Sequence, residues 1–228
     1  MNAPDDLMAR LQANEDIIHS AGHGRIEALR RAIAAGGDVN YLRSDQGALF
    51  MTVKQRQLPC AQLLMESGAN ANQKNRFGWT SLHEAALQDY PEFILPLVAG
   101  GAEKETPDIH GATALLAAAG NRSAAAAEAL LKVGAQVDRQ DALGNSPLHA
   151  ATANGDSPMV TMLLAYGANP GLKDAQGRTP LELAQDLGWT EGRILLEQAQ
   201  HAFTRAQAPP SAGPSGALSR IGRRPAGA

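Results

Sequence analysis

The chain has 228 residues, of which 44% are apolar but only 4% aromatic, a composition that favours close-packed helices with small side chains over a β-rich fold. The net charge of −3 is unevenly divided: residues 205–228 carry four arginines and no acid, so residues 1–204 hold 16 basic and 23 acidic side chains, a balance of −7 that argues against nonspecific nucleic-acid binding. A single cysteine, Cys60, excludes an intrachain disulfide and a cysteine-rich zinc site.

The N-terminal segment Met1–Asp6 is acidic and lacks the apolar stretch of a signal peptide. No apolar run of 18 residues, the length needed to span a bilayer, occurs in the sequence. We therefore expect a soluble, cytoplasmic protein without a membrane partner, and we predict a monomer.

A strict internal period dominates the rest of the chain. Four similar segments begin 33 residues apart, at Gly78, Gly111, Gly144 and Gly177. A second series of Gly-Ala pairs recurs with the same period, at Gly68, Gly101, Gly134 and Gly167. A fixed period of this length indicates stacked repeats, in which each unit buries its apolar face against its neighbours.

The repeated pattern Gly-x-Thr-Pro-Leu-His-x-Ala-Ala, followed by Leu-Leu and Gly-Ala-Asn, resembles the ankyrin repeat, most closely at residues 144–169. The resemblance implies an all-α solenoid of stacked helix-turn-helix units with β-hairpin-like fingers. We predict a repeat domain over residues 1–204, with units near 10–41, 42–74, 75–107, 108–140, 141–173 and 174–204.

Several units depart from the repeat pattern. In the first unit, an acidic segment, residues 5–16, replaces the opening turn, as in a terminal cap. The second unit has one residue fewer before Leu49 and no Thr-Pro, which predicts a shorter or misaligned finger. Pro96 falls inside the second helix of the third unit, where we expect a kink or a late start. Trp189 is expected to pack under the last helix with Leu187 and Ile194. The Pro-, Gly- and Ala-rich segment 205–228 is predicted to be a disordered tail.

Within a typical unit, four hydroxyl residues stand where they can cap the first helix: Thr80, Thr113, Ser146 and Thr179. The Gly of each Gly-Ala pair is placed to end the second helix in a left-handed conformation. These signals predict short helices with well-defined ends.

The sequence offers little support for catalysis or metal binding. His83 and His149 recur at one repeat position, so we expect each ring to hydrogen-bond the backbone of the adjoining finger. His19 and His23 have a spacing that two metal ligands could use, but no third ligand stands nearby in sequence. Cys60 lies among leucines, as a small apolar side chain would. We predict no enzyme activity, no cofactor and no metal site.

The sequence gives more support for binding to a protein partner than for catalysis. The resemblance implies a concave surface made by the finger tips and the inner faces of the first helices, through which a protein partner of unknown identity binds. Arg76, Phe77 and Trp79 draw attention because aromatic and arginine side chains dominate binding hot spots. Two alternatives remain for the rings of Phe77 and Trp79: they contact a partner, or they cover the adjacent finger. The predicted partner-binding residues are Arg76, Phe77, Trp79, Leu87, Gln88, Ile109, His110, Leu143 and Asn145.

These features predict a non-catalytic interaction module that acts as an adaptor, scaffold or inhibitor. An alternative is a bacterial effector acting on a host protein, since Arg outnumbers Lys 15 to 5 and Ala is frequent, as in GC-rich bacterial genomes. An enzyme that uses the histidines is a third, less favoured alternative.

Overall fold

The computed structural model describes residues 3–207. These residues form twelve helices and one two-stranded hairpin. In chain order the elements are α1 (Ala3–Gly22), α2 (Ile26–Ala34), β1 (Leu42–Arg43), β2 (Gln46–Gly47), α3 (Ala48–Lys54), α4 (Leu58–Glu66), α5 (Ser81–Leu87), α6 (Pro91–Ala99), α7 (Ala114–Gly120), α8 (Ala124–Lys132), α9 (Pro147–Ala153), α10 (Ser157–Ala165), α11 (Pro180–Asp186) and α12 (Thr190–Gln207).

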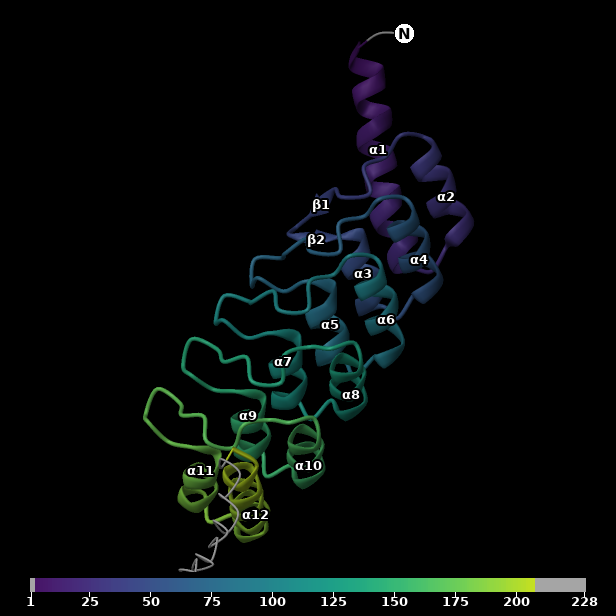
Figure 1. Cartoon of the computed structure of the whole chain (residues 1–228). Coiled ribbons are helices and arrows are strands. Elements are labelled where there is room, and N and C mark those ends of the chain that lie inside the picture. The colour runs from purple at the N-terminus through teal and green to yellow at the C-terminus, as the bar shows by residue number, and fades with distance from the viewer. Residues whose placement is uncertain (1–2, 208–228) are drawn as a thin grey trace, which may run out of the picture.

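The helices stack in two rows. Figure 1 shows α1, α3, α5, α7, α9 and α11 in an inner row beside the fingers, with the even-numbered helices in an outer row. Each inner helix contacts the next inner helix as well as the outer helix of its own unit. The predicted all-α ankyrin-like solenoid is therefore confirmed.

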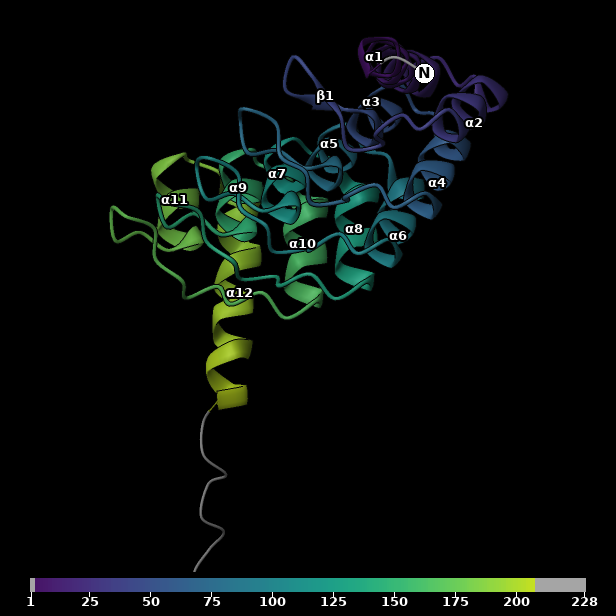
Figure 2. The same ribbon diagram turned by 90° about the horizontal axis from the view of Figure 1, so that it is seen from above.

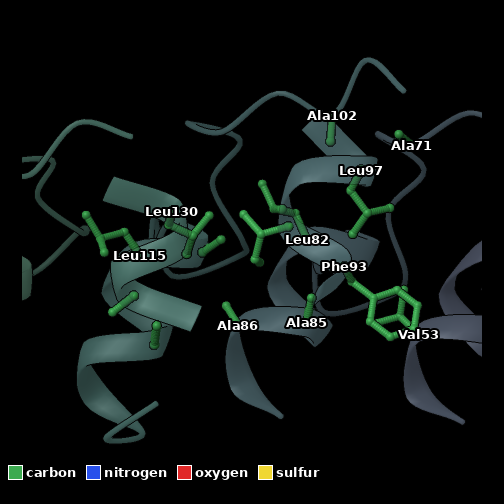
Figure 3. Packing of buried hydrophobic residues seen from close by; sticks show 14 of the residues in the cluster. Val53, Ala71, Leu82, Ala85, Ala86, Phe93, Leu97, Ala102, Leu115 and Leu130 are labelled. Atoms are coloured by element: carbon green, nitrogen blue, oxygen red, sulfur yellow. The ribbon is translucent and has the colours of Figure 1, made fainter. Parts of the chain in front are cut away.

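The core runs through the whole stack. Leu82, Leu115 and Leu148 occupy the same position in successive units, and each is less than 2% exposed. Figure 3 shows Leu82 and Leu115 in the apolar layer between helices, with Ala85 and Ala86 where helices approach closely. Full burial of a leucine side chain stabilises a fold by about 1.5–3 kcal/mol, so this column holds neighbouring units together.

The predicted helix ends are confirmed. Thr113, Ser146 and Thr179 each accept a hydrogen bond from the backbone N–H three residues later, which satisfies a donor at the helix start. After the second helices, the glycines of the Gly-Ala pairs have positive φ angles between 80° and 92°. These capping residues and glycines therefore give the units nearly equal length.

The acidic segment that replaces the opening turn of the first unit is helical. Residues 3–22 form one continuous 20-residue helix, α1. Its N-terminal part extends beyond α2 (Figure 1) and leaves Leu7, Met8 and Leu11 exposed. The segment contains no glycine before Gly22, and Pro4 lies in the first turn, so nothing interrupts the helix.

The second unit has the short finger that its missing residue predicts. Leu42 pairs with Gly47 and Arg43 with Gln46 in an antiparallel hairpin. The two residues between them, Ser44 and Asp45, have φ angles of 49° and 66°, as a tight two-residue turn requires. This finger is the one true β-hairpin within residues 3–207.

Two expectations about the outer helices need correction. Helix α6 starts at Pro91 and keeps the nine residues of α4, α8 and α10 despite Pro96, so the late start is wrong. Helix α12 extends well past its neighbours (Figure 2) and includes residues 205–207, three residues beyond the predicted boundary. The disorder predicted for the rest of the tail falls on residues 208–228, outside the described residues.

Trp189 is half-buried against the core, as expected, but its neighbours were assigned wrongly. Leu187 is 55% exposed and Ile194 46% exposed. The indole instead covers Gly192, where a Cβ atom would lie within 2.0 Å of the ring. Gly192 has no side chain, so the ring can approach the backbone of α12 at this point.

Candidate partner-binding surface

Each regular finger is held at its base by one side chain. Asn75, Asp108, Asp141 and Asp174 stand 33 residues apart, and each accepts hydrogen bonds from the backbone N–H groups two and four residues later. The distances lie between 2.8 and 3.0 Å. Such side-chain turns fix a loop without regular secondary structure. This series was not among the predicted features, although its 33-residue spacing is visible in the sequence.

The fingers are also joined to one another by backbone hydrogen bonds. Ile109 N–H donates to the Phe77 carbonyl at 3.2 Å, Ala142 N–H to the His110 carbonyl at 2.9 Å, and Ala175 N–H to the Leu143 carbonyl at 2.8 Å. The three bonds recur at equivalent positions. The fingers of the third to sixth units therefore form one ladder with a fixed spacing.

The ladder requires glycine at its turns. Gly78, Gly111 and Gly144 have positive φ angles, a conformation that side chains disfavour. At each one, a Cβ atom would also lie 2.8–2.9 Å from a backbone nitrogen of the following finger. These glycines permit both the left-handed turn and the close approach of the next finger.

His83 and His149 have the structural role expected of them. Each Nδ1 lies within 3.3 Å of the capping residue at the helix start, Thr80 or Ser146. Each Nε2 lies 3.1 Å from a carbonyl of the next finger, that of Ala112 or Arg178. Burial lowers the pKa of both imidazoles below the ordinary histidine value. Both rings are occupied in holding fingers to helices.

The predicted aromatic cluster is assembled on the third finger. The rings of Phe77 and Trp79 are 5.7 Å apart, and the Arg76 guanidinium lies 4.8 Å from the Phe77 ring centre. Trp79 is half-buried, and its indole N–H donates to Asp108 at 3.3 Å. Trp79 thus covers the adjoining finger, whereas Phe77, 43% exposed, faces outward.

Exposed apolar side chains follow the ladder from finger to finger. Phe77 is continued by Ile109, 61% exposed, and by Leu143, 60% exposed. We call Phe77, Ile109 and Leu143 the finger row. His110 is also exposed, beside Ile109. Phe77 and Leu143 stand at equivalent positions of the ladder with His110 between them, whereas Ile109 is one residue earlier on its finger.

The remaining predicted residues take part in hydrogen bonds within the fold. The Asn145 amide donates to Asp141 at 3.2 Å, and the Leu87 carbonyl accepts a hydrogen bond from Asn121 at 2.6 Å. Gln88 is exposed and donates to Glu84 at 3.2 Å. Burial raises the pKa of the Glu84 carboxyl on the inner face of α5.

Comparison with known proteins agrees with the geometry. The family model "Ankyrin repeats (3 copies)" matches residues 17–108 and 101–174, which together cover more than half of the chain. The chain belongs to the ankyrin-repeat family. Its repeats indicate a protein–protein interaction module.

Curated ankyrin-repeat relatives resemble only part of the chain. Human "Protein phosphatase 1 regulatory subunit 27" is 34% identical over 30% of this chain and 44% of its own length. The mouse protein of that name gives the same values. Human "Ankyrin repeat and SOCS box protein 3" is 33% identical over 45% of this chain and 27% of its own length. The chain thus spans less than half the length of these relatives.

Cys60 is buried, and burial raises the pKa of its thiol, which disfavours the reactive thiolate. Among residues 3–207, no group of three or more His, Cys, Asp or Glu side chains is arranged to hold a metal ion. The helices of this region also include none long and apolar enough to cross a bilayer.

Proposed function

We propose that this ankyrin array is a non-catalytic adaptor, scaffold or inhibitor that binds a protein partner through the finger row and the inner faces of α5, α7 and α9. The observation that carries the proposal is the exposed series Phe77, Ile109 and Leu143 on successive fingers. Exposed apolar side chains gathered in one series mark interaction sites on soluble proteins.

The shape of the inner face supports the proposal. Beside the finger row, α7 presents Ala117 and Gly120, and α9 presents Ala150 and Ala153, all at least partly exposed. These small residues project little from the inner face, so a partner segment can approach the helix backbone there. The backbone ladder keeps the finger row in place before binding, which reduces the entropy lost on association.

The partner chemistry that fits this surface is an apolar segment flanked by hydrogen-bonding groups. Arg76, His110 and Gln88 are exposed around the finger row and can donate to a partner's carboxylates or carbonyls. The names of the relatives describe a regulatory subunit and a SOCS box protein, and a non-catalytic role is consistent with both.

The test compares two triple variants of the full chain. The first replaces the finger row by serine: Phe77→Ser, Ile109→Ser and Leu143→Ser. The control replaces exposed apolar residues of the outer row instead: Leu95→Ser, Tyr166→Ser and Ile194→Ser. Because all six side chains are exposed, we expect the free energy of unfolding of each variant to lie within roughly 1–2 kcal/mol of the wild-type value.

The readout is quantitative affinity capture from lysate of the cells that produce the protein. The proposal predicts a partner retained by the wild type and by the outer-row control but lost from the finger-row variant. Equal retention by all three proteins, or loss from the outer-row control alone, would contradict it.

A further inference from the structure

A separate pocket lies at the N-terminal end of the inner face, away from the finger row. Its volume is about 230 Å³, and it lies between the C-terminal turns of α1, the β1 strand and α3. The apolar lining comes from Ile18, Gly22 and Met51. The polar lining consists of His19, His23, Arg43 and Gln55, all of which can donate hydrogen bonds.

The two histidines are arranged as a pair. Their ring centres are 4.2 Å apart, and both side chains are exposed to solvent. His23 Nδ1 lies 2.8 Å from the His19 carbonyl, to which it donates. Arg25 donates to His19 Nε2 at 3.4 Å. Within residues 3–207, the other two ring nitrogens, His19 Nδ1 and His23 Nε2, make no hydrogen bond.

These hydrogen bonds determine whether each ring nitrogen that faces a ligand is a donor or an acceptor. Neutral His23 carries its single N–H on Nδ1, so its Nε2 presents a lone pair and repels an anion. Protonation turns Nε2 into a donor. In His19, protonation of Nε2 ends the bond from Arg25 and places two cations side by side, an arrangement that an anion between them stabilises.

The charges near the pair are net positive even without the histidines. Arg43 on β1 is the charged side chain that lines this pocket besides the histidines. Arg25 on the loop after α1, Arg31 on α2 and Asp16 on α1 line an adjoining pocket that shares His19. Glu15 pairs with Arg43 at 3.1 Å, and Asp16 accepts from Gln12 at 3.0 Å. Protonation of both imidazoles adds two positive charges at the centre.

We propose that this pocket is an acid-dependent binding site for a phosphate-sized oxyanion, held by His19 and His23 together with Arg43 and Gln55. Histidine gains its charge between about pH 5 and 8, so the site strengthens as the pH falls through that range. The oxyanion belongs either to a phosphorylated side chain of a partner or to a free phosphate monoester. The inference does not depend on the finger row.

The test follows the imidazole Cε1–Hε1 signals of the full chain by NMR. Sodium sulfate is the first probe because sulfate remains a dianion across the range, so any pH effect arises in the protein. Sodium chloride at equal ionic strength is the salt control. We expect saturable shifts of the His19 and His23 signals at about pH 6, with affinity roughly fivefold or more above that at about pH 8. The signals of exposed His110 and His201 should follow ionic strength alone.

Variants localise the effect. His19→Asn should abolish the response of His23, and His23→Asn that of His19, while His201→Asn leaves both responses intact. Thermal unfolding by circular dichroism verifies that each variant is folded, and the wild-type signals alone test the site if a variant is not. Identical responses to sulfate and chloride, or sulfate affinity that does not change with pH, would overturn the proposal.

Two further probes distinguish the sources of the oxyanion. Methyl phosphate and N-acetyl-phosphoserine methylamide carry similar phosphate monoesters, but only the second has a peptide backbone. Tighter binding of the phosphoserine derivative assigns the pocket to a phosphorylated partner, with Ile18 and Met51 contacting the peptide. Equal binding of the two assigns it to a free phosphate monoester. Failure of both at about pH 6 contradicts the site.

Discussion

The close contact between fingers can be tested at two glycines that differ in one respect. Gly144 and Gly177 have nearly the same backbone conformation, with φ angles of 75° and 79°. A Cβ atom at Gly144 would lie 2.9 Å from the Ala175 nitrogen, whereas at Gly177 nothing lies within 4 Å. Gly144→Ala and Gly177→Ala therefore share the left-handed strain but not the collision with the next finger.

The expected magnitudes follow from these contacts. An alanine in the left-handed region costs about 1–2 kcal/mol, and both variants should lose this amount. Gly144→Ala must also push the sixth finger away and weaken the bond from Ala175 N–H to the Leu143 carbonyl, worth about 0.5–1.5 kcal/mol. We expect total losses of roughly 2–3 kcal/mol for Gly144→Ala and about 1–2 kcal/mol for Gly177→Ala.

Urea unfolding followed by far-ultraviolet circular dichroism measures the two free energies of unfolding. Amide hydrogen exchange at Ala175 gives a local readout, because its exchange should accelerate in Gly144→Ala and remain slow in Gly177→Ala. If the two variants lose the same stability and protect Ala175 equally, the ladder does not depend on glycine at the turn.

Three other changes probe the finger bases and the buried titratable groups. Asp108→Ala should lower the free energy of unfolding by roughly 1–3 kcal/mol in urea titrations, since two backbone N–H groups and the Trp79 indole N–H lose their acceptor. Asp108→Asn keeps the acceptor for the backbone, as Asn75 does one finger earlier, and loses only the bond from the indole, so its loss should be smaller; equal losses would contradict this role. Burial lowers the pKa of His83 and His149, so the unfolded chain takes up protons first and stability should decline as the pH falls below about 6.5. A His83→Gln/His149→Gln variant should show a smaller decline between about pH 7.5 and 5.5, and an unchanged decline would refute the assignment. Burial raises the pKa of Glu84, so the folded state holds that proton to higher pH than the unfolded chain and loses stability as the carboxyl ionises. Glu84→Gln should therefore be more stable than the wild type at about pH 7 but not at about pH 4, and no difference between the two pH values would contradict it.

The repeat architecture could be predicted from the sequence because its signals are local and recur in phase. The hydroxyl residue that starts the first helix of the third to sixth units and the glycine of each Gly-Ala pair act within a few residues, so their spacing alone gives the unit length. The short second finger followed in the same way, from one missing residue before Leu49. Helix α1 was not predicted because no finger precedes it, so the repeat pattern gives no helix start there. Residues 5–16 contain no glycine or proline that would stop the helix.

The candidate surface was harder to predict because it depends on where side chains turn. Trp79 and Phe77 stand two residues apart on one finger, yet one donates to Asp108 in the next unit while the other faces solvent. Asn145 occupies a finger position but turns back to Asp141. Such choices depend on contacts between residues about 30 positions apart or on a local turn, which the repeat pattern does not reveal.

The most direct test of the proposed function is photocrosslinking from the finger row in the cells that produce the protein. Benzoylphenylalanine is placed at Ile109, the most exposed residue of the row, and in a matched control at Leu95 on the outer helix α6, which is 66% exposed. We predict a discrete protein adduct from position 109 and none from position 95. An adduct from position 95 alone, or the same adduct from both, would contradict binding through the fingers.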